Sequence, residues 1–361
     1  MKYYICVDVR TPGYERLLEP PFKVIKHVRR AGALVSLGEE GIVPLREVFD
    51  DVASTCYNRE DGRTYRAIWL WDDSLANYEL TESTFEPLGF KQRPNWRRTI
   101  VRSMKANARR RAKAKRYRER DTALCAKLTE PTVRKGRISL FFPRYRHFLY
   151  GKPGGESCFR FRFFRAPGKK ALPLLIFLHG AGGRGYRGVT SMIDFAPVWP
   201  GLLLKKCHVL VPQLPLSNPY AAEVSEGLGE VIAGIPHVDR SRIYLMGLSM
   251  GGCGAVIECR RHPERYAACV TSVAALRNLE YPEITDGHEG PLDENAFDAL
   301  AKTPLWLGYS RDEKSVNEPL YDALNERGAN VKHTFIKGLG HGPAGPVFWL
   351  TKPWAKWLFS H

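Results

Sequence analysis

The sequence predicts an α/β protein: a mostly parallel β-sheet with helices on both faces, preceded by a small α+β module and a long basic helix. Two observations predict this organisation. From about residue 138, short apolar runs alternate with helical stretches, which is typical of parallel strands joined by crossover helices. Before that point, residues 91–120 carry a dense positive charge without such alternation. A chain of 361 residues has room for two domains.

The first 93 residues predict a small α+β module to which no role is assigned. Residues 2–9 and 64–71 are rich in β-branched and aromatic side chains and predict strands. Residues 33–45 predict a hairpin about the glycines at positions 38 and 41, and residues 45–54 predict a short helix.

The positive charge of the chain is concentrated in one segment. The formal net charge is +17, and residues 91–120 alone hold 14 Lys and Arg side chains against one acid. No Gly or Pro interrupts residues 95–130, and apolar residues at Trp96, Ile100 and Met104 recur every four positions. We therefore predict a basic helical linker over residues 94–130.

This basic helix has two competing interpretations. Its arginines and lysines, including Arg109 to Arg111, could neutralise several phosphates and bind nucleic acid weakly and without sequence preference. Aromatic residues for base stacking are few, only Trp96 and Tyr117, which argues against single-strand recognition. A solvated linker helix, or one packed on an acidic surface, is an equally supported alternative.

The remaining chain, residues 131–361, predicts one α/β domain. Residues 158–164 alternate between apolar and polar positions, as in an antiparallel strand with one wetted face. The continuous apolar runs predict buried strands over residues 172–180, 207–213, 242–247, 266–273, 303–309 and 331–338. Crossover helices are predicted over residues 221–235, 254–262 and 319–328.

A nucleophilic serine is predicted at Ser249. It lies in a Gly-x-Ser-x-Gly pattern between Gly247 and Gly251, directly after an apolar strand and directly before a helix. Such a strand-to-helix turn strains the serine backbone, so the positions two before and two after it must lack side chains. A glycine-rich turn that only serves packing is the competing interpretation.

A serine hydroxyl needs a base within hydrogen-bond reach, itself oriented by a carboxylate, and in this topology the chain order is serine, acid, histidine. His341 lies among glycines just after the last predicted strand and is the predicted base. His333 lies inside that strand, His262 in a helix and His288 in a polar loop, so these three are expected to be structural or solvated.

The acid is expected directly after the strand that ends near residue 309. Asp312 is the predicted acid, and the adjacent Glu313 stays open as the alternative.

The tetrahedral intermediate also needs two backbone N–H donors for its oxyanion. We expect one from Met250, which follows the nucleophile, and one from Ala181, or failing that Gly182, in the glycine-rich loop after residue 180. A phosphate-binding loop would require a following Gly-Lys-Ser/Thr, which the sequence lacks.

These motifs together, over roughly residues 138–358, resemble the α/β-hydrolase superfamily, in particular its small bacterial esterases, polyhydroxybutyrate-depolymerase-like and feruloyl-esterase-like enzymes and predicted peptidases. The resemblance implies a serine hydrolase that cleaves carboxylic esters through an acyl-serine, with Ser249, Asp312 and His341 as triad, Ala181 and Met250 as oxyanion donors, and no metal or organic cofactor. The alternatives are a serine peptidase of the same fold and a nucleic-acid-binding or partner-binding protein built on a hydrolase scaffold.

Composition and patterning add expectations about class and location. Hydrophobic residues at 44% exclude a disordered or collagen-like chain, and the eight cysteines form no Cys-x-x-Cys pair that would suggest a zinc site. No apolar run is long enough to cross a bilayer, and Asp8 and Arg10 interrupt any signal peptide, so we expect a cytoplasmic protein. The short connection between residues 273 and 304 predicts an open active site without a large lid.

Overall fold

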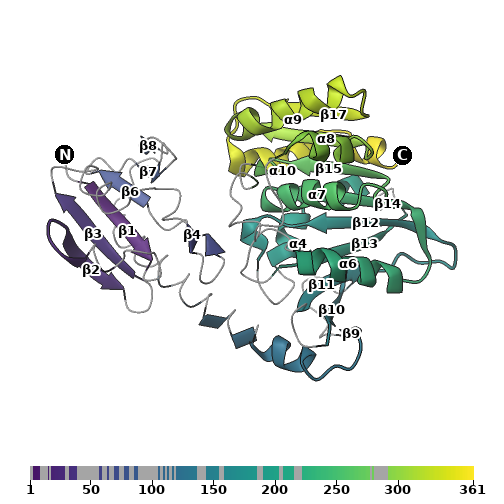
Figure 1. The fold of residues 1–361 in the computed structure, drawn as a ribbon, viewed down its shortest axis with the longest axis horizontal. Coiled ribbons are helices and arrows are strands. Elements are labelled where there is room, and N and C mark those ends of the chain that lie inside the picture. Colours follow the sequence, from purple (N-terminus) through teal and green to yellow (C-terminus); the bar gives the residue numbers. More distant parts are fainter. Residues whose placement is uncertain are drawn as a thin grey trace. The chain divides into compact units, whose positions relative to one another are not determined.

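The chain forms two compact units, Met1–Arg116 and Tyr117–His361, in the computed structural model shown in Figure 1. In the second unit and just before it, the structure describes residues 116–117, 119–135, 144–153, 158–184, 190–202, 206–214, 222–276, 279 and 292–361. In the rest of the first unit it describes residues 3–8, 15, 18–28, 32–38, 57–58, 63–64, 69–72, 77–80, 85–87, 105, 109, 112 and 113.

The described part of the first unit contains an antiparallel sheet of order β2-β3-β1-β6-β7-β8 and a two-stranded ribbon. The strands are β1 (Tyr3–Asp8), β2 (Lys23–Val28), β3 (Gly32–Gly38), β6 (Trp69–Asp72), β7 (Asn77–Leu80) and β8 (Phe85–Pro87), with β4 (Tyr57–Asn58) and β5 (Arg63–Thr64) in the ribbon. The strand predicted over residues 2–9 is present as β1. Of the strand predicted over residues 64–71, residues 69–71 lie in β6 and residue 64 in β5, while residues 65–68 lie outside the described residues. Strands β2, β4, β7 and β8 were not predicted. Residues 39–56, with the second half of the predicted hairpin and the predicted short helix, lie outside the described residues.

Part of the predicted basic helix is present, but it ends at Cys125 rather than at residue 130, because residues 126–130 form a turn and a bend. Lys105, Arg109, residues 112–113 and 116–117, and residues 119–125 are helical, while the other positions of 94–118 lie outside the described residues. The boundary between the two units, at Arg116, falls inside the predicted linker. The last turns of this helix therefore belong to the second unit.

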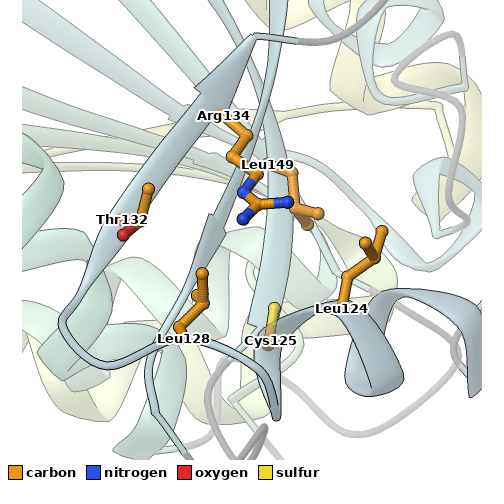
Figure 2. Close-up of a pocket in the computed structure, with 7 residues that line it drawn as sticks. Leu124, Cys125, Leu128, Thr132, Arg134 and Leu149 are labelled. Carbon is orange, nitrogen blue, oxygen red and sulfur yellow. The ribbon is translucent and has the colours of Figure 1, made fainter.

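The end of that helix is attached to the sheet of the second unit by a buried ion pair and a close contact. Asp121 accepts two hydrogen bonds from the Arg160 guanidinium, at 2.7 and 2.6 Å, and the two side chains are only 4% and 11% exposed. Cys125 is buried against Gly151, where an added Cβ would lie 2.1 Å from the sulfur. Figure 2 shows the shallow pocket beside this contact, lined by helix and strand residues.

The second unit is built on a mixed sheet with nine strands among its described residues, in the order β17-β16-β15-β14-β12-β13-β11-β10-β9. Strands β12 to β17 pair in parallel, and β9 to β11 add an antiparallel edge next to β13. The strands are β9 (Thr132–Lys135), β10 (Arg146–Gly151), β11 (Cys158–Phe164), β12 (Leu172–Leu178), β13 (His208–Gln213), β14 (Val238–Leu248), β15 (Ala268–Ser272), β16 (Leu305–Ser310) and β17 (Val331–Ile336). The predicted mostly parallel sheet is confirmed.

Helices cover both faces of this sheet (Figure 1), and alternate side chains of each central strand enter two different cores. Along β12, Leu174 and Ile176 join one core, whereas Leu175 and Phe177 join the other. The first core contains α6 (Ala222–Gly234), α7 (Met250–Arg261), α8 (Glu294–Leu300) and α9 (Lys314–Glu326). The second contains α4 (Thr190–Phe195), α5 (Trp199–Leu202), α10 (His341–Thr351) and α11 (Trp354–Leu358).

This double burial explains why the central strands are apolar without alternation, since neither face of the sheet meets water. The carboxyl ends of parallel strands lie together, so the segments that follow β12, β14, β16 and β17 lie at one edge of the sheet. Every helix among the described residues is too short or too polar to span a bilayer.

A substitution of Asp121 tests whether its ion pair with Arg160 anchors the end of the basic helix. We expect Asp121→Ala to lower the free energy of unfolding by about 3–5 kcal/mol, because it leaves a buried guanidinium without its counter-charge. The control is Glu226→Ala, which breaks an exposed pair with Lys152 and should change the free energy by less than about 1 kcal/mol. Urea unfolding curves measure both, and equal effects of the two variants would contradict the anchoring role.

Candidate active site

Ser249 occupies the turn between β14 and α7 in a backbone conformation that non-glycine residues rarely adopt, with φ 55° and ψ −115°. The flanking glycines are required by close backbone approaches. An added Cβ at Gly247 would lie 2.1 Å from the carbonyl oxygen of Gly251, and one at Gly251 would lie 2.0 Å from the carbonyl oxygen of Leu178. The strained turn expected from the Gly-x-Ser-x-Gly pattern is present.

Backbone hydrogen bonds hold this strained residue on both sides. The Ser249 N–H donates to the carbonyl of Ser272 at 2.9 Å. The Ser249 carbonyl accepts from Cys253 at 3.0 Å, within α7, and from Ala275 at 3.1 Å, beyond β15. The conformation is therefore fixed by the neighbouring strand as well as by its own helix.

His341 lies beside this serine, although 92 residues separate them along the chain. It is the first residue of α10, which begins after a short turn following β17. The distance between Ser249 Oγ and His341 Nε2 is 2.8 Å, a hydrogen-bond distance. The structure thus brings together the predicted nucleophile and the predicted base.

A carboxylate contacts the other nitrogen of the His341 ring, and it belongs to Glu313. Glu313 Oε1 lies 2.5 Å from His341 Nδ1, and the Glu313 side chain is only 6% exposed. Its second oxygen accepts the N–H of Ser310 at 3.0 Å and the hydroxyl of Ser310 at 2.7 Å. Burial opposes ionisation, but the hydrogen bonds from His341 and Ser310 outweigh it, so the pKa of Glu313 lies below its usual value. The carboxylate is therefore charged at neutral pH.

Asp312, the predicted acid, does not contact the ring. Its Oδ2 instead accepts the backbone N–H of His341 at 2.7 Å, and its side chain is 41% exposed. The prediction of Asp312 as the ring partner is corrected to Glu313, the alternative that the sequence left open. The two adjacent carboxylates hold the same histidine by different atoms.

The local turn after β16 explains this difference. Residues Arg311–Glu313 form a short 3₁₀ helix whose N-cap is Ser310, and a capping box joins Ser310 and Glu313. The capping bond draws the Glu313 side chain inward over the strand end and leaves Asp312 facing outward. The Ser-x-x-Glu spacing was visible in the sequence and would have favoured Glu313.

The loop predicted to supply an oxyanion donor passes directly beside Ser249. It forms a short 3₁₀ helix, η2 (Ala181–Gly183), after β12. Gly180, the residue before Ala181, contacts the nucleophile: a Cβ added to Gly180 would lie 3.5 Å from the Cβ of Ser249. Met250 opens α7, where the N–H groups of the first turn have no acceptor within the helix. Met250 thus follows Ser249 directly, and Ala181 follows Gly180, whose Cβ position contacts Ser249.

The other candidate histidines lie elsewhere. His333 Nδ1 is 2.8 Å from the hydroxyl of Tyr309 on the neighbouring strand, and His262 Nε2 is 3.1 Å from the hydroxyl of Ser225. His288 lies outside the described residues, as do residues 277–278 and 280–291 of the connection on which the expectation of an open active site depends.

Sequence reasoning missed the side chains that shape the loop after β12. His179 is fully buried, with Nδ1 2.7 Å from the carbonyl oxygen of Gly180 and Nε2 accepting the N–H of Leu214 at 2.9 Å. Gln213 donates to the carbonyl of Gly183 at 2.8 Å. Asp194 accepts the N–H of Gly180 at 2.9 Å. No local pattern marks these residues, because Gln213 and Asp194 reach the loop from other elements.

Comparisons with known proteins give fold-level matches alone. No protein-family model matches the chain, and no curated protein sequence matches it. Among solved structures, one titled as a thermostable esterase matches at a TM-score of 0.51 and 22% identity, covering 61% of this chain and 64% of that chain. The match therefore spans slightly less than two thirds of that structure.

Two further matches have lower TM-scores. A ferulic acid esterase is matched at a TM-score of 0.43 and 17% identity, covering 64% of this chain and 100% of that chain. An S-formylglutathione hydrolase from Staphylococcus aureus is matched at 0.45 and 15% identity, covering 63% and 98%. The fold predicted for the second unit is confirmed by the first match together with the strand order described above.

The contact between Glu313 and the His341 ring has a spectroscopic consequence. A short charge-assisted hydrogen bond should give the His341 Nδ1 proton a far-downfield NMR resonance. We expect Glu313→Gln to abolish or strongly shift this resonance, because the amide no longer carries the charge. The control Asp312→Asn should retain it, since Asp312 binds the backbone. The reverse pattern would contradict the assignment of Glu313 as the ring partner.

Proposed function

We propose that this chain, whose second unit has the α/β-hydrolase fold, hydrolyses carboxylic esters through an acyl-serine intermediate on Ser249. The observation that carries the proposal is the line of contacts from Ser249 Oγ through the His341 ring to Glu313, at 2.8 and 2.5 Å. A hydroxyl, an imidazole and a buried carboxylate in this order form the arrangement that activates serine for acyl transfer. The first structural match is a thermostable esterase, which favours an ester as the substrate.

In the first half of the reaction, His341 Nε2 takes the proton of Ser249 Oγ as the oxygen attacks the ester carbonyl carbon. The resulting oxyanion accepts hydrogen bonds from the backbone N–H groups of Ala181 and Met250. When the intermediate collapses, the bond to the alcohol oxygen breaks and Nε2 returns its proton to the leaving alkoxide. The alcohol departs, and the acyl group stays on Ser249.

In the second half, a water molecule replaces the alcohol. His341 Nε2 takes a proton from the water as its oxygen attacks the acyl carbon, and a second oxyanion forms in the same place. Collapse breaks the bond to Ser249 Oγ, which recovers the proton from Nε2, and the carboxylic acid is released. Each step uses side chains and backbone groups of this chain together with water.

The two carboxylates have separate tasks in this mechanism. The ionised Glu313 holds Nδ1–H and stabilises the positive charge that the imidazole carries after each proton transfer. Asp312 fixes the backbone of His341 at the start of α10. The oxyanion donors contribute about 3 kcal/mol each to transition-state stabilisation in comparable sites.

Covalent labelling tests the nucleophile. We expect a fluorophosphonate probe to label the protein, and Ser249→Ala to abolish labelling and to lower kcat for p-nitrophenyl esters by about 10⁶-fold, because the attacking oxygen is removed. The control is Ser225→Ala, which removes the only other described serine hydroxyl hydrogen-bonded to a histidine ring and should leave labelling unchanged. Labelling that survives Ser249→Ala would refute the assignment. Peptide anilides hydrolysed faster than esters would identify a peptidase with the same nucleophile.

A second function is suggested by the basic helix. Lys105, Arg109, Lys113 and Arg116 are all helical and exposed. Their spacing of four, four and three residues places them on one face of a helix. We propose that this cationic face binds the phosphates of duplex nucleic acid weakly and without sequence preference.

Salt dependence tests this second proposal. If four cations each displace one counterion, the affinity for a random DNA duplex should fall about 100-fold between 50 and 200 mM salt. Replacing Lys105, Arg109, Lys113 and Arg116 by alanine should remove this binding. The control replaces four exposed lysines of the second unit by alanine and loses the same charge: Lys169, Lys170, Lys302 and Lys352. This control should keep most of the DNA binding. Filter binding measures all three proteins, and an absence of binding at low salt would reject the proposal.

A further inference from the structure

The loop after β12 is held by side chains that come from several parts of the second unit. Its carbonyl groups accept hydrogen bonds from Arg184, whose Nε lies 3.0 Å from the oxygen of Ala181, and from Gln213, at 2.8 Å from the oxygen of Gly183. His179 lies beneath the loop, and an added Cβ on Gly183 would be 2.6 Å from its ring. The carbonyl groups of Ala181 and Gly183 are thus held by one side chain at the end of the loop, Arg184, and one from β13, Gln213.

Asp194 binds the N–H groups of the same loop. Its carboxylate, on the short helix α4, accepts the N–H of Gly180 at 2.9 Å and shares the N–H of Gly183 with the carbonyl oxygen of Gly180, which lies 2.9 Å from that nitrogen. The Cβ position of Gly180 lies 3.4 Å from Asp194 Oδ2 and 3.5 Å from the Cβ of Ser249. One peptide separates the carboxylate from the nucleophile.

We infer that Asp194 is a positioning residue of the catalytic site, whose carboxylate clamps the N–H groups of Gly180 and Gly183, the residues that bracket Ala181 and Gly182, so that the Ala181 N–H is held for the oxyanion. This inference rests on the proposed acyl transfer at Ser249. Asp194 acts through the backbone of the loop and contacts no reacting atom.

The clamp depends on the charge of the Asp194 carboxylate, because an ionised oxygen accepts N–H bonds more strongly than a protonated one. Burial raises the pKa of Asp194 to about 6, although the N–H groups of Gly180 and Gly183 oppose this rise. Above pH 6 the Asp194 carboxylate is therefore charged and binds both N–H groups. As the pH falls through 6, the carboxylate gains a proton and the clamp weakens.

Several other ionisable groups lie around Asp194. Among the described residues, α4 packs against η2, β12, β13 and Tyr145, and the ionisable residues there are Tyr145, His179, Arg184, Cys207 and His208. Burial lowers the pKa of His179 to about 4, so its ring stays neutral near pH 6. Burial also lowers the pKa of His208 and raises the pKa of Tyr145. Within this set, Asp194 is the group whose carboxylate accepts the N–H of Gly180 beside Ser249.

The test compares the pH dependence of kcat in the wild type and in Asp194→Asn. In the wild type, protonation of Asp194 should weaken the clamp, so the ratio of the wild-type kcat to the variant kcat should be largest above pH 6 and should fall toward 1 as the pH drops through 6. Asp194→Asn keeps the shape and one acceptor oxygen but cannot titrate. We expect the variant kcat to be about 10- to 100-fold below that of the wild type at pH 8 and within about threefold of it at pH 5, with a KM within about threefold of the wild type, because the lost interaction acts in the transition state.

Controls separate positioning from folding and from the proposed function itself. Asp322→Asn changes an exposed aspartate of α9 and should match the wild type in kcat at both pH values. Circular dichroism melting checks that Asp194→Asn is folded; if it is not, Asp194→Ser takes its place in the same comparison. A ratio of wild-type to variant kcat that stays the same between pH 8 and pH 5, or an unchanged kcat in the folded variant, would overturn the inference. A wild type that a fluorophosphonate fails to label would instead overturn the proposed function.

Discussion

Ser249 holds φ at 55° and ψ at −115°, and the neighbouring groups of the site are arranged around that backbone conformation. A residue forced into this region costs about 1–3 kcal/mol, so it persists only where the surroundings determine it. Hydrogen bonds to Ser272 and Ala275 tie the turn to the next strand, and the backbones of Gly247 and Gly251 approach too closely for any side chain. The hydroxyl consequently projects from the edge of the sheet, within reach of an imidazole from another loop.

The electrostatics of the site follow from where its two carboxylates lie. Glu313 is buried and would resist ionisation, but three hydrogen-bond donors keep it charged beneath the His341 ring. Asp312 is partly exposed, and its carboxylate accepts a hydrogen bond from the backbone N–H of His341. A single turn therefore supplies one carboxylate that can stabilise an imidazolium and another that fixes the backbone of the same residue. Two adjacent acids give rigidity to a histidine that begins a helix after a glycine-rich turn.

Much of the fold followed from local patterns. The continuous apolar runs of β12, β13, β14, β15 and β16 identify strands buried on both faces, and the division of their side chains between two cores is the physical origin of that pattern. The weakly patterned strands of the first unit, such as β7 and β8, were missed, because a strand of three or four residues carries too few positions for an alternation to emerge. The anchoring of the basic helix by Asp121 and Arg160 was equally invisible, since the pair joins residues 39 apart.

The sequence by itself determined the alternation of strands and helices, the serine turn and the order of serine, acid and histidine, because backbone sterics and burial act on residues that are neighbours in the chain. Only the tertiary structure decided which of two adjacent carboxylates meets the His341 ring, and that Asp194 and Gln213 hold the loop beside Ser249. The physical reason is that the direction of a side chain depends on partners that folding brings from distant segments, and a linear pattern does not encode those distances.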